Sequence, residues 1–131
     1  MQRFELPMKF VSVNEYIALC KSRKGNYNPS QLYKHRVQDE IVAHLKAGKI
    51  KRIKKPVFFR FIWYEATKRR DKDNVAFGKK FVMDGLQSAG ILENDNNQWV
   101  MGFADYFVYG KGQKVVVEIY DCDEVEIEGA V

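Results

Sequence analysis

The strongest constraint on the fold is a run of aromatic and branched apolar residues, PVFFRFIWY, at residues 56–64. Side chains of these types favour the pleated, half-buried surface of a β-strand. Arg60 is the one charged residue in the run. We therefore expect a buried strand that lies centrally in a sheet.

The beginning of the chain predicts a strand followed by a short helix. Residues 4–11 alternate loosely and contain Pro7, a combination that is typical of an edge strand. Ser12 or Asn14 is suited to cap a helix that runs to Cys20.

A second helix is expected after the polar loop KSRKGNYN, because Asn28 and Pro29 supply a cap and a first-turn proline. Gly48 is placed to end this helix. Its apolar residues recur at roughly helical spacing and are expected to face the core. They are Leu32, Val37, Ile41, Val42 and Leu45.

The second half of the chain predicts one helix and then only strands. The helix is expected over residues 73–89 and is ended by Gly90. Residues 110–113, GKGQ, are expected to form the hairpin turn between the last two strands. The expected strands are residues 98–101, 103–109 and 114–121.

Helices and strands are interspersed without strict alternation, so we expect an α/β or α+β fold with a mixed sheet packed with helices. A chain of 131 residues, 46% of them hydrophobic, suits a single domain over residues 1–131. No apolar run approaches the ~20 residues of a membrane span. The N-terminus lacks a secretory signal, and Cys20 and Cys122 form no CxxC pair. We therefore expect a cytoplasmic protein with free thiols and no membrane association.

The net charge of +5 conceals a strong asymmetry along the chain. Residues 1–80 carry 20 Lys and Arg against 7 Asp and Glu, whereas residues 81–131 carry 2 against 10. Basic clusters lie at residues 21–24, 46–55 and 68–70, and clusters of this density attract a polyanion such as nucleic acid. The candidate DNA-binding residues are Lys24, Lys51, Arg52, Lys68, Arg69 and Arg70.

Residues 69–97 contain most of the candidate catalytic residues. Asp71 and Asp73 are separated by one residue, a spacing that points both carboxylates to the same side of an extended segment. Asp95 follows in a polar loop after the expected helix. It can approach the other two aspartates only through the tertiary arrangement.

The expected helix would present two separate faces. Phe77, Lys80 and Asp84 follow Asp73 at helical spacing and would form a stripe that lines an open cleft. The opposite face would pack against the core through Val75, Val82, Leu86 and Ala89.

These residues suit metal-dependent cleavage of a phosphodiester. Mg²⁺ or Mn²⁺ prefers hard oxygen ligands, so two or three carboxylates and a substrate phosphate would form a suitable site. The metal would lower the pKa of a bound water, neutralise charge on the phosphate and orient an in-line attack. Lys80 would add fixed positive charge near the developing oxyanion or the leaving oxygen.

Each part of this pattern also has an ordinary structural explanation. Aspartates before a helix are good caps and complement the helix dipole. Lys80 with Asp84 is a common i,i+4 surface pair, and residues 94–97 have the composition of a turn. Only the combination favours a catalytic site.

Other chemistries have less support in the sequence. His35 and His44 lie on one expected helix without i,i+4 spacing, which argues against a zinc site or an HNH-type nuclease. The chain has no GxSxG, P-loop or GxGxxG motif. A serine hydrolase, an NTPase or a protein with a nucleotide cofactor is therefore not expected.

The order of these motifs resembles the RusA-type crossover junction endodeoxyribonucleases, small Holliday junction resolvases that are frequent in bacteriophages and prophages. The similarity covers residues 69–95, which contain a basic pair, Asp-x-Asp-Asn, Lys-x-x-x-Asp-x-Leu, Ala-Gly and an acidic loop. The resemblance implies a homodimer that binds four-way DNA junctions and makes paired symmetric incisions with Mg²⁺ or Mn²⁺. Such an enzyme acts in DNA recombination and repair, in the cytoplasm of a bacterial or phage-infected cell.

The resemblance also assigns roles to individual residues. It implies Asp71, Asp73 and Asp95 as metal ligands and Lys80 as the catalytic lysine. In the commoner family pattern the lysine follows the aspartates about three residues sooner, so Lys79 is an alternative. The acidic loop lacks the frequent double aspartate, so Glu93 is a further candidate ligand, and Asp84 is another.

Other functions remain open at this point. A less selective metal-dependent nuclease would use the same site, whereas a non-catalytic or architectural DNA-binding protein would use the aspartates only as caps. A protein-interaction module would bind an acidic partner through the basic half. Tyr27, Tyr64 and Phe77 are candidates to stack on bases near a branch point, with core packing as the alternative for each.

Overall fold

The computed structural model describes residues 1–124, which form a small α/β domain with a mixed four-stranded sheet. The expected fold class is confirmed. The elements in chain order are β1 (Gln2–Leu6), α1 (Val13–Lys21), α2 (Pro29–Ala47), β2 (Val57–Glu65), α3 (Lys72–Ala76), α4 (Lys79–Ser88), β3 (Val100–Tyr109), β4 (Lys114–Asp121) and the short 3-10 helix η1 (Cys122–Glu124).

Strand β2 lies inside the sheet, whose strand order is β1-β4-β2-β3. It pairs in parallel with β3 on one side and antiparallel with β4 on the other. At mid-strand Phe61 is opposite Asp105 of β3 and Val117 of β4. The expectation of a central, buried strand is therefore confirmed.

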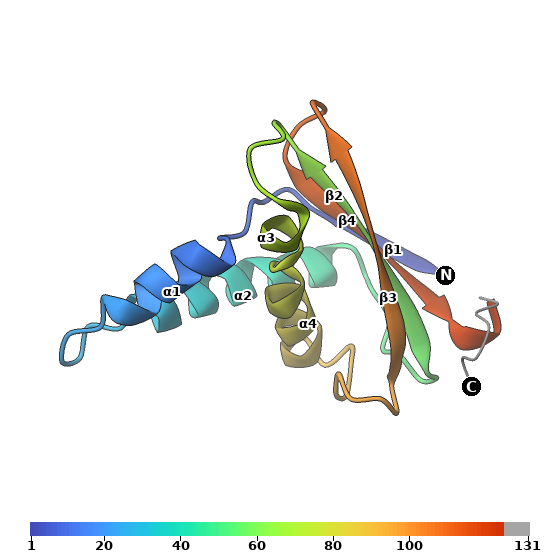
Figure 1. Ribbon diagram of the computed structural model, residues 1–131. Coiled ribbons are helices and arrows are strands. Elements are labelled where there is room, and N and C mark those ends of the chain that lie inside the picture. The colour runs from blue at the N-terminus through green and yellow to red at the C-terminus, as the bar shows by residue number, and fades with distance from the viewer. Residues whose placement is uncertain (125–131) are drawn as a thin grey trace.

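The helices and the hydrophobic core lie on one face of the sheet (Figure 1). Alternate residues of β2 are buried, as expected for a strand with one covered face. Phe59 and Phe61 are fully buried on that face. Helices α2 and α4 pack against each other where Ile41 lies against Gly85. The core thus fixes α4 relative to both the sheet and α2.

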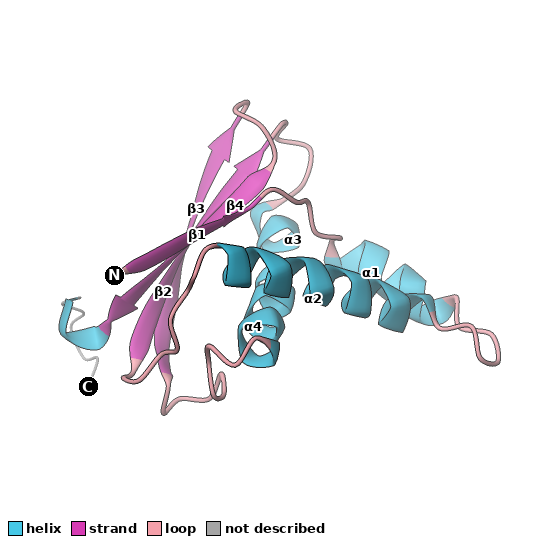
Figure 2. Ribbon diagram, turned by 180° about the vertical axis from the view of Figure 1, so that it is seen from behind, coloured by secondary structure: helices cyan, strands magenta, loops and turns pink. Residues whose placement is uncertain are grey.

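Helix α1 and the first half of α2 project from the sheet as a two-helix arm, with residues 21–28 at its far end (Figure 2). Ser12 caps α1: its hydroxyl accepts the N–H of Glu15 at 3.2 Å, and the Glu15 carboxylate accepts the N–H of Ser12 at 3.0 Å. This hydrogen bonding to Ser12 lowers the pKa of Glu15. Of the two expected caps, Ser12 and Asn14, the structure confirms Ser12, and Asn14 lies inside α1.

Leu32 is not in the core, contrary to expectation. Its exposed fraction is 61%, whereas Ile41 and Leu45 farther along α2 are fully buried and Val42 is half-buried. The helix predicted from the spacing of these residues is confirmed. The spacing could not show that the first half of α2 extends beyond the sheet.

The expected helix over residues 73–89 is divided into α3 and α4. Between them the N–H groups of Gly78 and Lys80 donate to the carbonyls of Val75 and Phe77, three residues back, which is the tighter 3-10 pattern. Gly78 also lies against the ring of Phe10, where a Cβ would come within 2.5 Å of Cδ2. Close packing on Phe10 therefore coincides with the break.

The break interrupts the stripe that was expected along one helix face. Phe77 packs against Tyr16 and Phe81, with ring centroids 5.7 Å away in both cases. It contributes to the core side of the helices and not to an open cleft. Lys80 remains exposed, whereas Asp84 is half-buried.

The expected hairpin between the last two strands is wrong. β3 and β4 both pair with β2, which lies between them. Residues 110–113 cross the end of β2, where the Gly110 N–H donates to the Glu65 carbonyl at 2.9 Å and the Ala66 N–H donates to Oε1 of Gln113 at 3.4 Å. A glycine-rich turn sequence cannot show whether the strands that it joins pair directly or straddle a third.

The remaining differences concern the ends of strands. β1 is an edge strand as expected, but it ends at Leu6, directly before Pro7. Residues 98–101 and 103–109 do not form two strands, because β3 continues through Gly102. Cys20 and Cys122 are free thiols. None of the helices within residues 1–124 is long and apolar enough to cross a membrane.

Gly85→Ala tests the contact between α4 and α2. A Cβ at this position would lie 2.4 Å from Cγ2 of the fully buried Ile41. Overpacking costs about 1–3 kcal/mol and should exceed the gain of about 1 kcal/mol in helix propensity. We expect a lower free energy of unfolding in a urea titration. Gly48→Ala, at the exposed end of α2, is a control expected to change stability by less than about 1 kcal/mol. Unchanged stability of Gly85→Ala would contradict this packing.

Candidate functional site

Asp71 and Asp73 lie at the start of α3, after the loop that leaves β2. Asp71 occupies the N-cap position, but its carboxylate makes no capping hydrogen bond. Oδ1 of Asp73 accepts the N–H of Asn74 at 3.0 Å. Both aspartates are exposed, and neither forms an ion pair within the described residues. Because Asp71 makes no capping bond and Asp73 uses one oxygen for the Asn74 N–H, the other carboxylate oxygens are accessible to a ligand.

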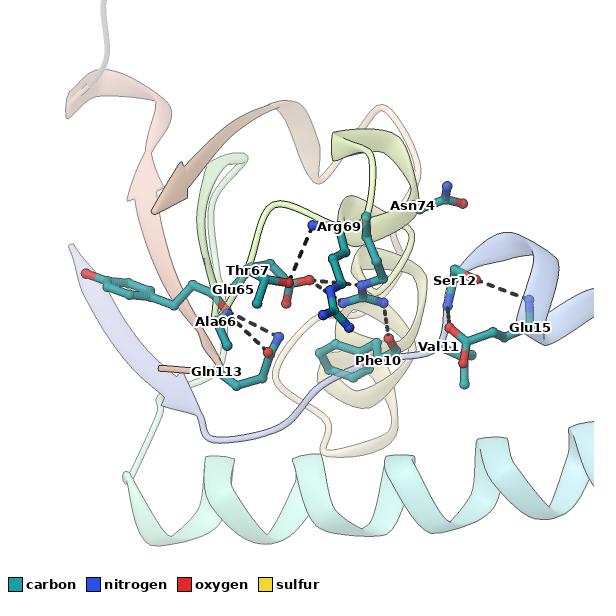
Figure 3. Close-up of polar contacts among 12 residues, drawn as sticks. Phe10, Val11, Ser12, Glu15, Glu65, Ala66, Thr67, Arg69, Asn74 and Gln113 are labelled. Carbon is teal, nitrogen blue, oxygen red and sulfur yellow. Dashed lines mark hydrogen bonds and ion pairs between the residues drawn. The ribbon is translucent and has the colours of Figure 1, made fainter. Parts of the chain in front are cut away.

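A buried ion pair holds the loop that precedes Asp71. The Arg70 guanidinium contacts Oε1 of Glu65 through Nη2 at 2.8 Å and Nε at 2.9 Å, and its Nη1 donates to the Phe10 carbonyl at 2.7 Å. The exposed side-chain fractions are 6% for Glu65 and 16% for Arg70. Figure 3 shows the polar contacts around this loop, including those of Glu65 and Phe10. Arg70 is thus directed inward, and we assign it to anchoring the loop and not to the expected DNA-binding surface.

Three other cationic side chains belong to the same segment. Lys68 and Arg69 are exposed on the loop, and Lys72 is exposed on the first turn of α3. The ammonium groups of Lys68 and Lys72 lie 5.4 and 5.5 Å from the centre of the Tyr109 ring. These cation–π contacts place positive charge over the end of β3, beside the start of α3. The segment can therefore attract a phosphate to the vicinity of two carboxylates.

Lys79 and Lys80 have different surroundings. Nζ of Lys79 is 2.7 Å from Oδ2 of Asp105 and 4.8 Å from the centre of the Phe103 ring. Nε1 of Trp63 donates to the other Asp105 oxygen at 2.8 Å. Lys79 therefore ties α4 to the sheet. Lys80 is exposed and makes no ion pair in the part of the chain that the structure describes.

Asp105 was not among the residues that the sequence predicted for the site. It is the one acidic residue of β3, and its register opposite Phe61 places it on the core face of the sheet. A lone acid in an otherwise apolar strand was the available signal. Because Lys79 and Trp63 occupy both of its oxygens, Asp105 helps to position the start of α4 and has little capacity for another ligand.

Asp95 lies at the other end of the sheet from Asp71. The loop that carries it reaches the start of β2, where the Val57 N–H donates to the Trp99 carbonyl at 2.9 Å, whereas Asp71 follows the end of β2. The eight steps from the first to the last residue of this nine-residue strand span about 26 Å at ~3.3 Å each. Figure 1 likewise shows the loop after α4 far from α3. Within one chain, Asp95 does not join the other two aspartates.

The remaining acidic candidates do not complete the site either. Asp84 lies in a small depression with Lys34 and Gln38 of α2, and Glu93 is exposed on the same loop as Asp95. Across residues 1–124, no group of three or more His, Cys, Asp and Glu side chains could hold a metal ion. The oxygen donors at the start of α3 suit Mg²⁺ chemically, but one chain does not assemble the expected three-carboxylate site.

The basic residues 46–55 form a second cationic surface, at the opposite end of the sheet from Lys68. Four of them line a pocket of about 250 Å³ that also borders Asp121. The Arg52 guanidinium donates to the Gly90 carbonyl at 2.9 Å, which ties this segment to the end of α4. The four are Lys51, Arg52, Lys54 and Lys55.

No protein-family model matches this chain, and no curated protein matches it as a relative. The resemblance to RusA-type resolvases therefore rests on the motif at residues 69–95.

Arg70→Met tests whether the ion pair anchors the loop. Removing one partner of a buried pair leaves Glu65 as an unpaired buried charge, so the free energy of unfolding should fall by about 3 kcal/mol. Arg69→Met is the matched control, because Arg69 is exposed and its replacement should change stability by less than about 0.5 kcal/mol. Thermal unfolding of both variants measures the difference. If both variants lose equally little stability, Arg70 does not anchor the loop.

Proposed function

We propose that this protein is a Mg²⁺- or Mn²⁺-dependent endonuclease that cleaves four-way DNA junctions, acting as a homodimer in DNA recombination and repair. The observation that carries the proposal is the pair of exposed carboxylates, Asp71 and Asp73, on an anchored loop with accessible cations. Neither carboxylate is committed to an ion pair within residues 1–124, and Asp71 makes no capping bond. The purely structural role of these aspartates as caps is thus only weakly supported.

The residues around this pair have separable roles in the proposal. Lys68 and Arg69 bind the phosphates next to the cleaved bond, and Lys72 attracts the same strand. Arg70 holds the loop so that Asp71 and Asp73 meet the phosphate in one geometry. Bound by these carboxylates, Mg²⁺ would activate a water and neutralise charge on the phosphate.

The exposure of Lys80 supports its proposed role as the catalytic lysine. Its ammonium is available to a substrate, whereas the ammonium of Lys79 is held by Asp105 and by aromatic rings. Replacing Lys79 should therefore affect the packing of α4 more than the chemistry. Lys80 would instead stabilise negative charge on an oxygen of the scissile phosphate.

The position of Asp95 explains why the proposed enzyme would need to be a homodimer in order to cleave DNA. Asp71 and Asp95 are at opposite ends of the sheet in one chain, so a site with all three aspartates requires Asp95 from a second copy. Two copies related by a twofold axis would form two such sites, one for each strand to be cut. Paired symmetric incision would then follow from the symmetry of the dimer.

A second candidate function is a DNA-binding protein without catalytic activity. The observation that favours it is that the described residues of one chain contain no cluster of three potential metal ligands. The exposed basic clusters would still bind DNA in this case, and the affinity would fall with increasing salt. Only the endonuclease would cleave DNA, so a cleavage assay distinguishes the two functions.

Asp73→Asn tests the proposed chemistry. The purified protein is incubated with a labelled four-way junction and with a linear duplex of the same sequence, in Mg²⁺, Mn²⁺ or EDTA. We expect paired, metal-dependent cuts in the junction, lowered more than about 100-fold in the variant, the scale of single electrostatic groups in active sites. Asp39→Asn, an exposed aspartate on α2, should cleave like the wild type. Binding without cleavage would favour the non-catalytic protein, and equal cleavage of both DNAs a general nuclease.

Mixing two inactive variants tests whether the site is shared between copies. In a heterodimer of Asp73→Asn and Asp95→Asn chains, a shared arrangement leaves one site with both changes and one site intact. We therefore expect mixing to restore single nicks in the junction but not paired cuts. If each site lies within one chain, both sites of the heterodimer are damaged. The absence of any restored nicking, although native mass spectrometry with one variant isotope-labelled shows that mixed dimers form, would contradict the shared site.

A further inference from the structure

The end of the projecting arm has the properties of a binding surface. Residues 21–27, here called the arm tip, are all exposed, and the figures show them at the point of the molecule farthest from the sheet (Figures 1 and 2). Helix α1 has no buried residue, so it adds little to the core. A 19-residue α2 is about 28 Å long, and its sheet-side half packs through Ile41 and Leu45. In the outer half, Tyr33 packs on Phe81, whereas Leu32, His35 and Arg36 are exposed.

The arm tip has a defined conformation. The Lys24 N–H donates to the Tyr27 carbonyl at 2.9 Å, and the Tyr27 N–H donates to the Lys24 carbonyl at 2.8 Å. Gly25 has a φ of 55° within this turn, a conformation that glycine adopts without strain. Behind the tip, Pro29 and Ser30 are buried. Side chains on the tip are thus presented from an ordered turn.

The charge of this region is uniformly positive. Residues 16–38 contain five Lys and Arg and no Asp or Glu. None of the five makes an ion pair to another described residue. They are Lys21, Arg23, Lys24, Lys34 and Arg36. The acidic residues of α2, Asp39 and Glu40, lie in the half nearer to the sheet, so the outer half of the arm complements a polyanion.

Tyr27 differs from the other aromatic residues near the arm. Tyr16, Tyr33 and Phe77 pack around Phe81. Tyr27 is 59% exposed and takes part in no aromatic or cation–π contact within residues 1–124. An exposed ring among cations is the combination that binds unpaired nucleic-acid bases, since the ring stacks on a base while the cations contact phosphates.

We propose that the arm tip binds branched DNA beside the cleavage site, with Tyr27 stacked on an unpaired base and Lys21, Arg23 and Lys24 on the phosphates. Tyr16 of α1 packs 5.7 Å from Phe77, next to α3, and nine-residue α1 is about 14 Å long. The arm therefore begins next to α3, and the tip lies beyond the far end of α1 on the same face of the sheet (Figure 1). This inference rests on the proposed function in one respect, namely that the substrate is DNA.

The principal alternative occupant of the arm is a second copy of the chain. Ile17 and Leu32 are exposed on the two helices, with exposed fractions of 43% and 61%. A contact between copies through these residues would bury them without requiring the cations or the ring of Tyr27. The mass of the protein in solution therefore distinguishes the two occupants.

The test compares Tyr27→Ser, Tyr27→Phe and the double variant Arg23→Ala/Lys24→Ala with the wild type. Affinities for a four-way junction and a linear duplex are measured in EDTA, over a range of salt concentrations. We expect Tyr27→Ser to bind the junction about tenfold more weakly, with Tyr27→Phe close to the wild type because its ring is retained. The double variant should lose about two units of the slope of log affinity against log salt. Tyr106→Ser, an aromatic residue 50% exposed on β3, is the control and should bind normally.

The outcomes separate this inference from the proposed function. If the wild type binds and cleaves junctions but Tyr27→Ser and the double variant bind equally well, the arm tip has no role in DNA binding. If the wild type binds no DNA, the proposed function fails and the inference fails with it. If Leu32→Ser lowers the mass measured by light scattering, and weakens junction binding while the tip variants bind normally, the outer arm is a contact between copies and the proposal fails. Weaker binding at unchanged mass, restored in Tyr27→Phe, supports the proposal.

Discussion

The buried ion pair between Glu65 and Arg70 is the interaction on which the arrangement of the candidate site depends. Glu65 ends the central strand on the core side of the sheet, where an unpaired carboxylate would be costly. Its partner Arg70 also binds the Phe10 carbonyl, so one guanidinium joins the end of β2 to the β1–α1 connection. Asp71 follows directly. The position of the two exposed carboxylates is therefore set by a contact inside the protein and not by the surface loop itself.

The distribution of ion pairs explains why a net charge of +5 understates the positive surface. Within residues 1–124, Glu5, Asp105 and Glu118 of the sheet pair with cations that lie outside the three basic clusters. Glu118 binds Arg60, and Asp105 binds Lys79. Arg70 is the one member of the clusters that forms such a pair in the described chain. The other cluster cations remain accessible on the loop after β2, at the opposite end of the sheet and on the arm tip.

Features that depend on short segments could be predicted from the sequence. The composition of residues 56–64 predicted the central strand, and Ser12 predicted the cap of α1. Features that depend on contacts between distant residues could not be predicted. Whether β3 and β4 pair directly is decided by the insertion of β2 between them. The inward direction of Arg70 depends on Glu65 and Phe10, which nothing in a single basic cluster reveals.

The same distinction between short segments and contacts of distant residues applies to the candidate site. The sequence correctly placed the start of a helix beside Asp73. The spacing of Asp71 and Asp73 was expected to point both carboxylates to one side of an extended segment, whereas Asp73 lies in the first turn of α3. The sequence could not place Asp95, because the strand that separates it from Asp71 acts as a spacer of about 26 Å. Nor could it show that Lys79 is held by Asp105 whereas Lys80 is exposed, since that contact involves a residue of the neighbouring edge strand.

Binding of a divalent metal ion by the carboxylates at the start of α3, on which the proposed function depends, can be measured in solution without reliance on cleavage. Paramagnetic Mn²⁺ broadens the amide NMR signals of residues close to it. In the isotope-labelled protein, we expect sub-stoichiometric Mn²⁺ to broaden the signals of Lys72, Asp73 and Asn74 first, together with those around Asp95 if two copies share the site. Asp73→Asn should remove both effects. Broadening confined to other acidic residues, with the start of α3 unaffected, would contradict the account.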